Sequence, residues 1–262
     1  MPFPSYQFLQ IEAHGRVVLI TLRREDKLNA MNSAMMGELT DCFRLVHELA
    51  EVRAVVLTGS GKAFMAGADI GEYNESDIGA FFAFQNRGRE MYRSIEVCAK
   101  PVIAAVNGYA LGGGFELALA CDLIVASQRA KFGLPEVNLG LVPGGGGVQK
   151  LLRIVGPYAA KELLMTGAYL SAEEGRALRF VNRVTEPERL LDEALALAQQ
   201  IAEKAPLAVQ GLKRLVNEGR DASLESAQAY DRAYLANLFH SADAREGIAA
   251  FLEKRPPVFN GK

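Results

Sequence analysis

The chain has no tryptophan and contains only three cysteines and three histidines in its 262 residues. The cysteines, Cys42, Cys98 and Cys121, form no Cys-x-x-Cys pair and cannot all pair with one another. We therefore interpret them as reduced, buried, small apolar residues, which indicates a reducing compartment, most simply the cytoplasm. The histidines are far apart, and no His, Cys and carboxylate set has the spacing of a zinc site, so no metal is predicted.

Strong net charge and long apolar runs are also absent. The formal net charge is −2 and no long Lys/Arg run occurs, which gives no support for a nucleic-acid partner. No apolar stretch reaches the roughly 18–20 residues that span a bilayer, so no membrane segment is predicted. The first six residues have neither the charged leader nor the apolar segment of a signal peptide.

What is present is an alternation of buried strands and amphipathic helices. Half of the residues are hydrophobic and 23% are charged, as in a globular protein with one sizeable core. Apolar, β-branched runs predict strands at 17–22, 52–58, 102–106 and 123–126, with a short extended piece at 132–133. A helix is expected from Asn32 or Ser33 to about residue 50. This alternation favours an α/β fold with largely parallel strands.

The pattern becomes helical from about residue 171. Apolar spacing and proline positions predict helices at 190–204, 206–217, 223–238 and 243–254. We therefore divide the chain into a core that holds the active site, residues 1–196, and a helical region, residues 197–262.

The sequence does not match the common nucleotide-binding motifs. The segment that ends in Gly59-Ser60-Gly61-Lys62 follows a predicted strand, but a phosphate loop needs glycine at position 56 and a hydroxyl at 63, where valine and alanine stand. The glycines at 144–147 do not have the Gly-x-Gly-x-x-Gly spacing of a dinucleotide site. No Gly-x-Ser-x-Gly motif of a serine hydrolase is present.

Two stretches place a lone carboxylate among glycines and apolar residues. Glu116 follows Gly112-Gly113-Gly114, and Glu136 follows Pro135 shortly before the glycines 144–147. Poor solvation raises the pKa of a carboxyl group toward neutrality, where the group can both accept and donate a proton. The glycines leave backbone N–H groups open to a developing oxyanion. The alternatives are that Glu116 only suits a helix N-terminus and that Glu136 is a solvated loop residue.

A third stretch, residues 63–70, is a loop of small residues that follows a predicted strand. Its exposed N–H groups are candidates for a second oxyanion donor, although a tight turn with Asp69 as a helix cap fits the same residues. The aromatic residues Phe81, Phe82 and Phe84 fit either the wall of a substrate pocket or the buried face of a helix.

These motifs, in their order and spacing, resemble those of the crotonase superfamily, and most of all the enoyl-CoA hydratases. The resemblance covers residues 27–30, 63–70, 101–122, 132–147 and 246–255, and so runs almost from end to end. It implies a spiral of β-β-α turns followed by a helical trimerisation region, in a homotrimer or a homohexamer. It also implies a lyase of fatty acid metabolism (β-oxidation) that needs no cofactor, because coenzyme A is part of its substrate.

The resemblance assigns roles to individual residues. Glu116 and Glu136 match the two catalytic glutamates, and the N–H groups of Ala68 and Gly113 match the oxyanion hole. The matches to the coenzyme A site are Lys27, Ala66, Asp69, Ile70 and Gly144, together with Phe251 and Lys254 from a neighbouring subunit. Two departures concern that site: Gly71 stands where a lysine is common, and Val148 replaces a threonine, which predicts a looser loop.

The reaction implied is syn addition of water to a trans-2-enoyl-CoA. Other reactions on the same scaffold remain open, namely double-bond isomerisation, dehalogenation and C–C cleavage. A non-catalytic binding protein is the alternative from another class.

Overall fold

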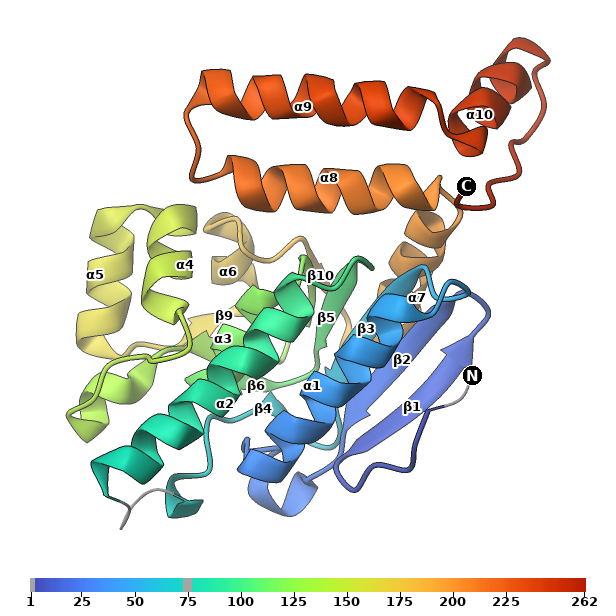
Figure 1. Cartoon of the computed structure of the whole chain (residues 1–262). Helices are drawn as coiled ribbons and strands as arrows, with labels where there is room; N and C mark the ends of the chain where they lie inside the picture. The colour runs from blue at the N-terminus through green and yellow to red at the C-terminus, as the bar shows by residue number, and fades with distance from the viewer. Residues whose placement is uncertain (1–2, 73–76) are drawn as a thin grey trace.

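The computed structural model, which describes residues 3–72 and 77–262, is a spiral in which two strands and a helix repeat (Figure 1). The repeats are β3 (Ala54–Gly59), β4 (Ala63–Met65) and α2 (Ile78–Glu96); β5 (Val102–Val106), β6 (Tyr109–Leu111) and α3 (Gly113–Ala120); and β7 (Leu123–Ser127), β8 (Lys131–Gly133) and α4 (Gly147–Val155). In every repeat the first strand joins a larger sheet and the second a smaller one. The expected β-β-α spiral is thereby confirmed.

The larger sheet has the strand order β1-β2-β3-β5-β7-β10 and the smaller one β4-β6-β8-β9. β1 (Leu9–His14) runs antiparallel to β2 (Val17–Leu22), and the strands from β2 to β10 (Arg183–Thr185) are parallel. β9 (Leu170–Ser171) closes the smaller sheet in the antiparallel sense. The strands expected from apolar runs are present, whereas β1, β4, β6, β9 and β10 were not predicted. Four of these have only two or three residues, and β1 (LQIEAH) is at the sheet edge and contains polar residues.

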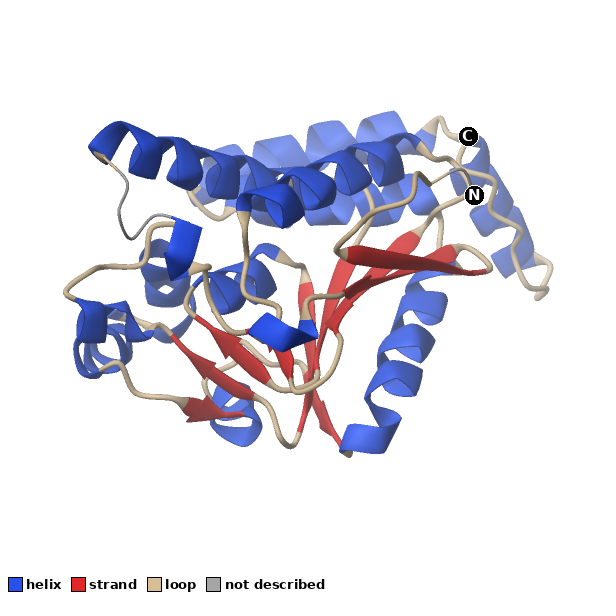
Figure 2. Ribbon diagram, turned by 90° about the horizontal axis from the view of Figure 1, so that it is seen from below, coloured by secondary structure: helices blue, strands red, loops and turns tan. Residues whose placement is uncertain are grey.

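Both faces of the central strands β2, β3, β5 and β7 are buried, which explains why these strands are almost continuously apolar. On one face, α7 (Leu190–Ala202) packs its alanines onto alternate residues of the central strands, such as Val56 and Ile103. The other alternate residues, such as Val55 and Leu57, belong to the apolar cluster that includes residues of α1 (Ser33–Glu48), α2 and α3. Figure 2 shows helices on both faces of the sheet. Asn32 caps α1 by accepting a hydrogen bond from the N–H of Met35 at 2.8 Å.

The rest of the chain is helical. α5 (Pro157–Thr166) and α6 (Ala172–Ala177) lie beside the smaller sheet, and α8 (Pro206–Gly219), α9 (Leu224–Phe239) and α10 (Ala242–Leu252) follow α7. α8 and α9 lie side by side above the sheets in Figure 1. The expected division after residue 196 falls inside α7, which packs on the sheet along its whole length. Across the described ranges, no helix is both long and apolar enough to cross a membrane.

One ion pair ties α8 to the core. The ammonium of Lys213 lies 2.8 Å from the carboxylate of Asp122, and the two side chains are 7% and 19% exposed. Lys213 also donates to the carbonyl oxygens of Ile95 and Lys100, while Asp122 accepts from the N–H of Val102. The two charges are stable in this mostly buried place because each is paired with the other and also hydrogen-bonded to the backbone.

Replacing Lys213 with methionine is expected to lower the free energy of unfolding by about 3 kcal/mol, because Asp122 is left mostly buried without its counter-ion. Urea unfolding at pH 7 measures the change. The matched control is Arg214→Met on the next residue of α8, whose partner Glu218 is exposed, and this change should leave stability nearly unaltered. Equal losses in the two variants would contradict the assignment.

Candidate active site

Three neighbouring parallel strands of the smaller sheet, β4, β6 and β8, end at one edge. The segments that follow them carry Ala68, then Gly113 and Glu116, then Glu136. A hydrogen bond of 2.8 Å from the N–H of Gly112 to the carbonyl of Gly133 joins two of these segments. Ligands commonly bind outside the carboxyl ends of parallel strands, and a cavity lies at this edge.

The N–H groups of Ala68 and Gly113 are adjacent at the end of the strands. Each residue follows a glycine with positive φ, Gly67 (103°) and Gly112 (51°), which turns the chain sharply at the strand end. A β-carbon placed on Gly113 would lie 3.8 Å from the nitrogen of Ala68. Neither N–H donates a hydrogen bond within the described part of the chain. The two amides therefore form a site for one negatively charged oxygen.

Glu116 lies in the first turn of α3 and is 3% exposed. Its Oε1 accepts hydrogen bonds of 2.8 Å from the N–H groups of both Gly145 and Gly147. Burial raises the pKa of the carboxyl group, and the two amides and the charge of Lys150 oppose that rise. A loosened loop was expected from Val148, but these two hydrogen bonds hold the loop on the carboxylate.

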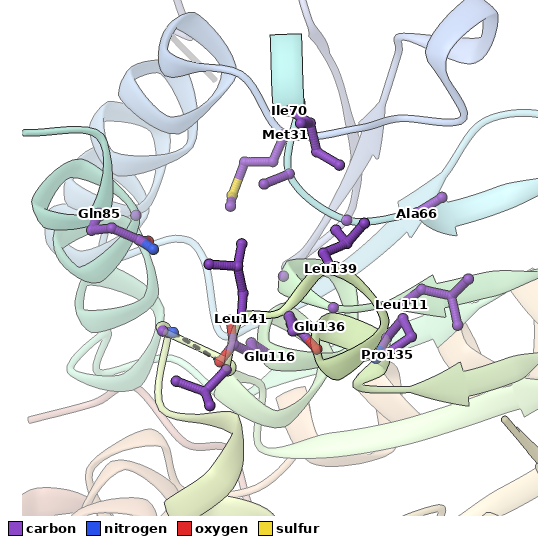
Figure 3. Close-up of a pocket in the computed structure, with 18 of the residues that line it drawn as sticks. Met31, Ala66, Ile70, Gln85, Leu111, Glu116, Pro135, Glu136, Leu139 and Leu141 are labelled. Carbon is purple, nitrogen blue, oxygen red and sulfur yellow. Dashed lines mark hydrogen bonds between the residues drawn. The ribbon is translucent and has the colours of Figure 1, made fainter. Parts of the chain in front are cut away.

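Glu136 has a different environment. Its Oε2 is buried and accepts no hydrogen bond from the described residues. Burial is the main cause that raises its pKa to about 7, and the negative charge of Glu116 adds to the rise. In Figure 3 both carboxyl groups point into the same pocket. A carboxylate that accepts two amide hydrogen bonds thus lies near a carboxyl group whose pKa is raised to about 7.

The cavity has a volume of about 340 Å³ and brings together most of the residues expected from the sequence. Glu116, Glu136, Ala68, Gly113, Ala66, Ile70 and Gly144 line it. Asp69 does not: it accepts a 2.6 Å hydrogen bond from Arg24, and this bond is the main cause that lowers its pKa. Lys27 is exposed close to Asp69, outside the lining.

Phe251 and Lys254 lie apart from the cavity, in α10 and just after it. Phe251 is 83% exposed. Within one chain these two residues do not contribute to the pocket. Of the three phenylalanines on α2, Phe81 and Phe84 line the cavity, whereas Phe82 is 59% exposed. The pocket-wall interpretation therefore holds for Phe81 and Phe84, and Phe84 is also buried, whereas neither interpretation fits Phe82.

Tyr92 is a lining residue that sequence reasoning missed. Its buried hydroxyl donates a 3.0 Å hydrogen bond to the carbonyl of Gly113. Burial, followed by the charges of Glu116 and Glu136, raises the pKa of the phenol well above its usual value. The available signal was its helical spacing from Phe81, Phe84 and Gln85, which places all four on one face of α2.

Two further residues support the pocket from behind the loop 66–70. Arg24 donates to the carbonyl of Ala30 at 2.8 Å as well as to Asp69. Asn29 is fully buried and donates to the carbonyls of Ser60 and Ala63. The Lys27-Leu28-Asn29-Ala30 motif therefore has a structural role, because its hydrogen bonds hold the backbone that leads into the loop.

Taken together, the geometry defines a site for proton transfer beside a carbonyl group. It offers two adjacent amides for an oxyanion and two carboxyl groups, one held by two amide N–H groups and one with a buried oxygen that accepts no hydrogen bond from the described residues. Among residues 3–72 and 77–262, no group of three His, Cys, Asp or Glu side chains is placed to hold a metal ion.

Comparisons with known proteins agree with this class. A model of the enoyl-CoA hydratase/isomerase family matches residues 12–262. The short-chain-enoyl-CoA hydratase of Clostridium acetobutylicum is 41% identical over 94% of each chain, and the crotonyl-CoA hydratase of Syntrophomonas wolfei is 40% identical over 98% of this chain and 100% of its own. The crystal structure of an enoyl-CoA hydratase from Bacillus anthracis superposes with a TM-score of 0.95 at 37% identity, covering 98% of this chain and 100% of that one. The chain belongs to the enoyl-CoA hydratase/isomerase family and has the crotonase fold.

The carboxyl group of Glu136 should titrate near pH 7, and Glu116→Gln should lower that pKa because it removes a nearby negative charge. NMR titration of protein labelled with ¹³C at the glutamate carboxyl carbons measures both values, with Glu136→Gln identifying the signal. The control Glu162→Gln changes an exposed residue of α5 and should leave the titration unaltered. A wild-type midpoint at the ordinary value of about 4.3 would contradict the described environment.

Proposed function

We propose that the protein is an enoyl-CoA hydratase that adds water in the syn sense to a trans-2-enoyl-CoA and yields a 3-hydroxyacyl-CoA. The observation that carries this proposal is the pair of unlike carboxyl groups in one cavity with two unpaired amides. Water addition needs a base and an acid at once, whereas moving a double bond needs only one group that takes and returns a proton.

In the proposed mechanism Glu116 is the base. Its Oε1 is held by two amides, which favours the ionised form. The carboxylate accepts a proton from water as the water oxygen bonds to the β-carbon. The electron pair of the double bond moves toward the thioester, whose oxygen gains negative charge between the N–H groups of Ala68 and Gly113. Each such amide typically contributes about 10²–10³ in rate.

Glu136 is the acid. With a pKa of about 7 and no hydrogen bond to Oε2 from the described residues, it can carry a proton at neutral pH and gives this proton to the α-carbon. One proton has then left water and one has entered the product, so that a proton must pass from Glu116 to Glu136 before the next turnover. The mechanism uses this chain's own groups and water, and the absence of a cofactor is part of the proposal, because coenzyme A belongs to the substrate.

Coenzyme A is proposed to bind along the loop 66–70. Ala66, Ile70 and Gly144 line the cavity and can contact it directly. The side chain of Asp69 is engaged by Arg24, so its proposed contact is through the backbone. Lys27 lies near this loop and is proposed to meet a phosphate group.

Assembly into a homotrimer or a dimer of trimers is part of the proposal. Large apolar side chains are exposed on the C-terminal helices, among them Leu212, Val216, Leu235, Phe239 and Leu252. Burial of this surface by other copies is favourable. Phe251 and Lys254, which lie outside their own pocket, would reach coenzyme A in a neighbouring subunit. A cytoplasmic role in β-oxidation is proposed on the same basis as the reaction.

Glu116→Gln and Glu136→Gln should each reduce hydration of crotonyl-CoA at least about 100-fold, because each removes one acid/base group. Loss of absorbance of the conjugated thioester measures the rate. Glu162→Gln should retain the wild-type rate. Near-wild-type turnover in either pocket variant would contradict the mechanism.

Product mass separates the alternatives. Hydration adds the mass of one water, isomerisation adds none, and dehalogenation or C–C cleavage releases a fragment. If no acyl-CoA is turned over and the protein instead binds a protein or nucleic acid at physiological salt, the non-catalytic alternative is favoured.

A further inference from the structure

Helix α2 turns one face toward the cavity. Phe81, Phe84, Gln85, Gly88 and Tyr92 all line it. Their spacing of three, four, seven and eleven residues from Phe81 places them along one side of the helix. Four of these positions carry large side chains, and Gly88 carries none.

The backbone does not require glycine at position 88. The residue lies in the middle of the 19-residue helix α2 and has helical geometry. Glycine in a helix interior is unfavourable relative to alanine, because it has more conformational freedom to lose on folding. A conformational reason for Gly88 is therefore absent.

The surrounding space does not require glycine either. A β-carbon at position 88 would lie 3.7 Å from Cε of Met36 and 4.0 Å from Cε2 of Tyr92, which are ordinary contact distances. Gly145 shows the opposite case, because its β-carbon would lie 2.2 Å from the same Cε2 atom and 2.5 Å from Oε2 of Glu116. Glycine is obligatory at 145, whereas at 88 alanine would fit.

Gly88 lines the cavity, and the place where its side chain would stand is a notch beside the ring of Tyr92, which also lines the cavity. Cε2 of Tyr92 faces the vacant position of Gly88 and also the bare backbone of Gly145, which lies against Glu116. The other wall is the thioether of Met36, a side chain that adapts readily to different shapes. The notch is thus apolar and separated from the Glu116 carboxylate by the edge of one ring.

We propose that the notch at Gly88 receives the part of the acyl chain beyond the β-carbon, and that Gly88 determines the acceptance of straight-chain enoyl-CoAs longer than the four-carbon crotonyl group. The inference rests on the proposed hydratase function. With the β-carbon held between Glu116 and Glu136, crotonyl-CoA has a single methyl group left to place, whereas longer chains must extend past Tyr92. Met36 and the ring of Tyr92 offer apolar contact to a hydrocarbon chain and no counter-ion to a charged one.

The test compares Gly88→Ala with the wild type on crotonyl-CoA, trans-2-hexenoyl-CoA and trans-2-octenoyl-CoA. The added methyl group fills the notch, so the ratio of kcat/KM for octenoyl-CoA to that for crotonyl-CoA should fall about tenfold. The same variant should raise the melting temperature by about 2–4 °C, since alanine favours the helix. Loss of long-chain activity in a more stable protein is not explained by damage to the fold.

The control is Gly37→Ala in α1, an exposed helical glycine with nothing within 4 Å of its β-carbon position. It should raise the melting temperature similarly and leave the ratio unaltered. An unaltered ratio in Gly88→Ala, or a lowered melting temperature that shows Gly88 to be needed for the packing of α1 on α2, would overturn the inference. Failure of the wild type to hydrate crotonyl-CoA would instead refute the proposed function.

Discussion

The burial of the Glu116 carboxylate is the constraint on which the rest of the site depends. Removing a charged group from water is costly unless hydrogen bonds replace the lost hydration, and here the N–H groups of Gly145 and Gly147 supply them. Their backbone must approach so closely that a side chain at 145 would collide with Tyr92 and with the carboxylate itself. The glycine-rich loop, the start of α4 and the position of Tyr92 are therefore consequences of one buried charge. The raised pKa of Glu136 follows in part from the same charge.

The larger architecture places these groups by simple strand geometry. Three parallel strands of the smaller sheet end side by side, so residues 45 and 68 positions apart in sequence, Ala68, Gly113 and Glu136, converge without a long loop. Positive-φ glycines at two of the strand ends turn the following N–H groups toward the cavity. The spiral thus converts a repeated strand-strand-helix pattern into one reaction centre.

Features that depend on neighbouring residues in the sequence could be predicted, whereas contacts between residues distant in the sequence could not. The strands at 17–22 and 102–106 were predictable because both of their faces are buried, and Glu116 and Glu136 stood out as lone carboxylates among glycines. The pairing of Asp69 with Arg24 joins residues 45 positions apart, and no local pattern indicates it. Tyr92 looked like any aromatic residue on a helix. The glycines at 145 and 147 suggested contact with a ligand, whereas they approach the enzyme's own carboxylate.

The ammonium of Lys213 has a mechanical consequence for the pocket. It grips the carbonyl of Ile95 near the end of α2 and the carboxylate of Asp122, two residues beyond the end of α3. These two helices carry Tyr92 and Glu116, which line the cavity. One cation therefore links the ends of two helices that position lining residues. Because Lys213 belongs to α8, a displacement of the C-terminal helices would shift the ends of the two helices that carry Tyr92 and Glu116.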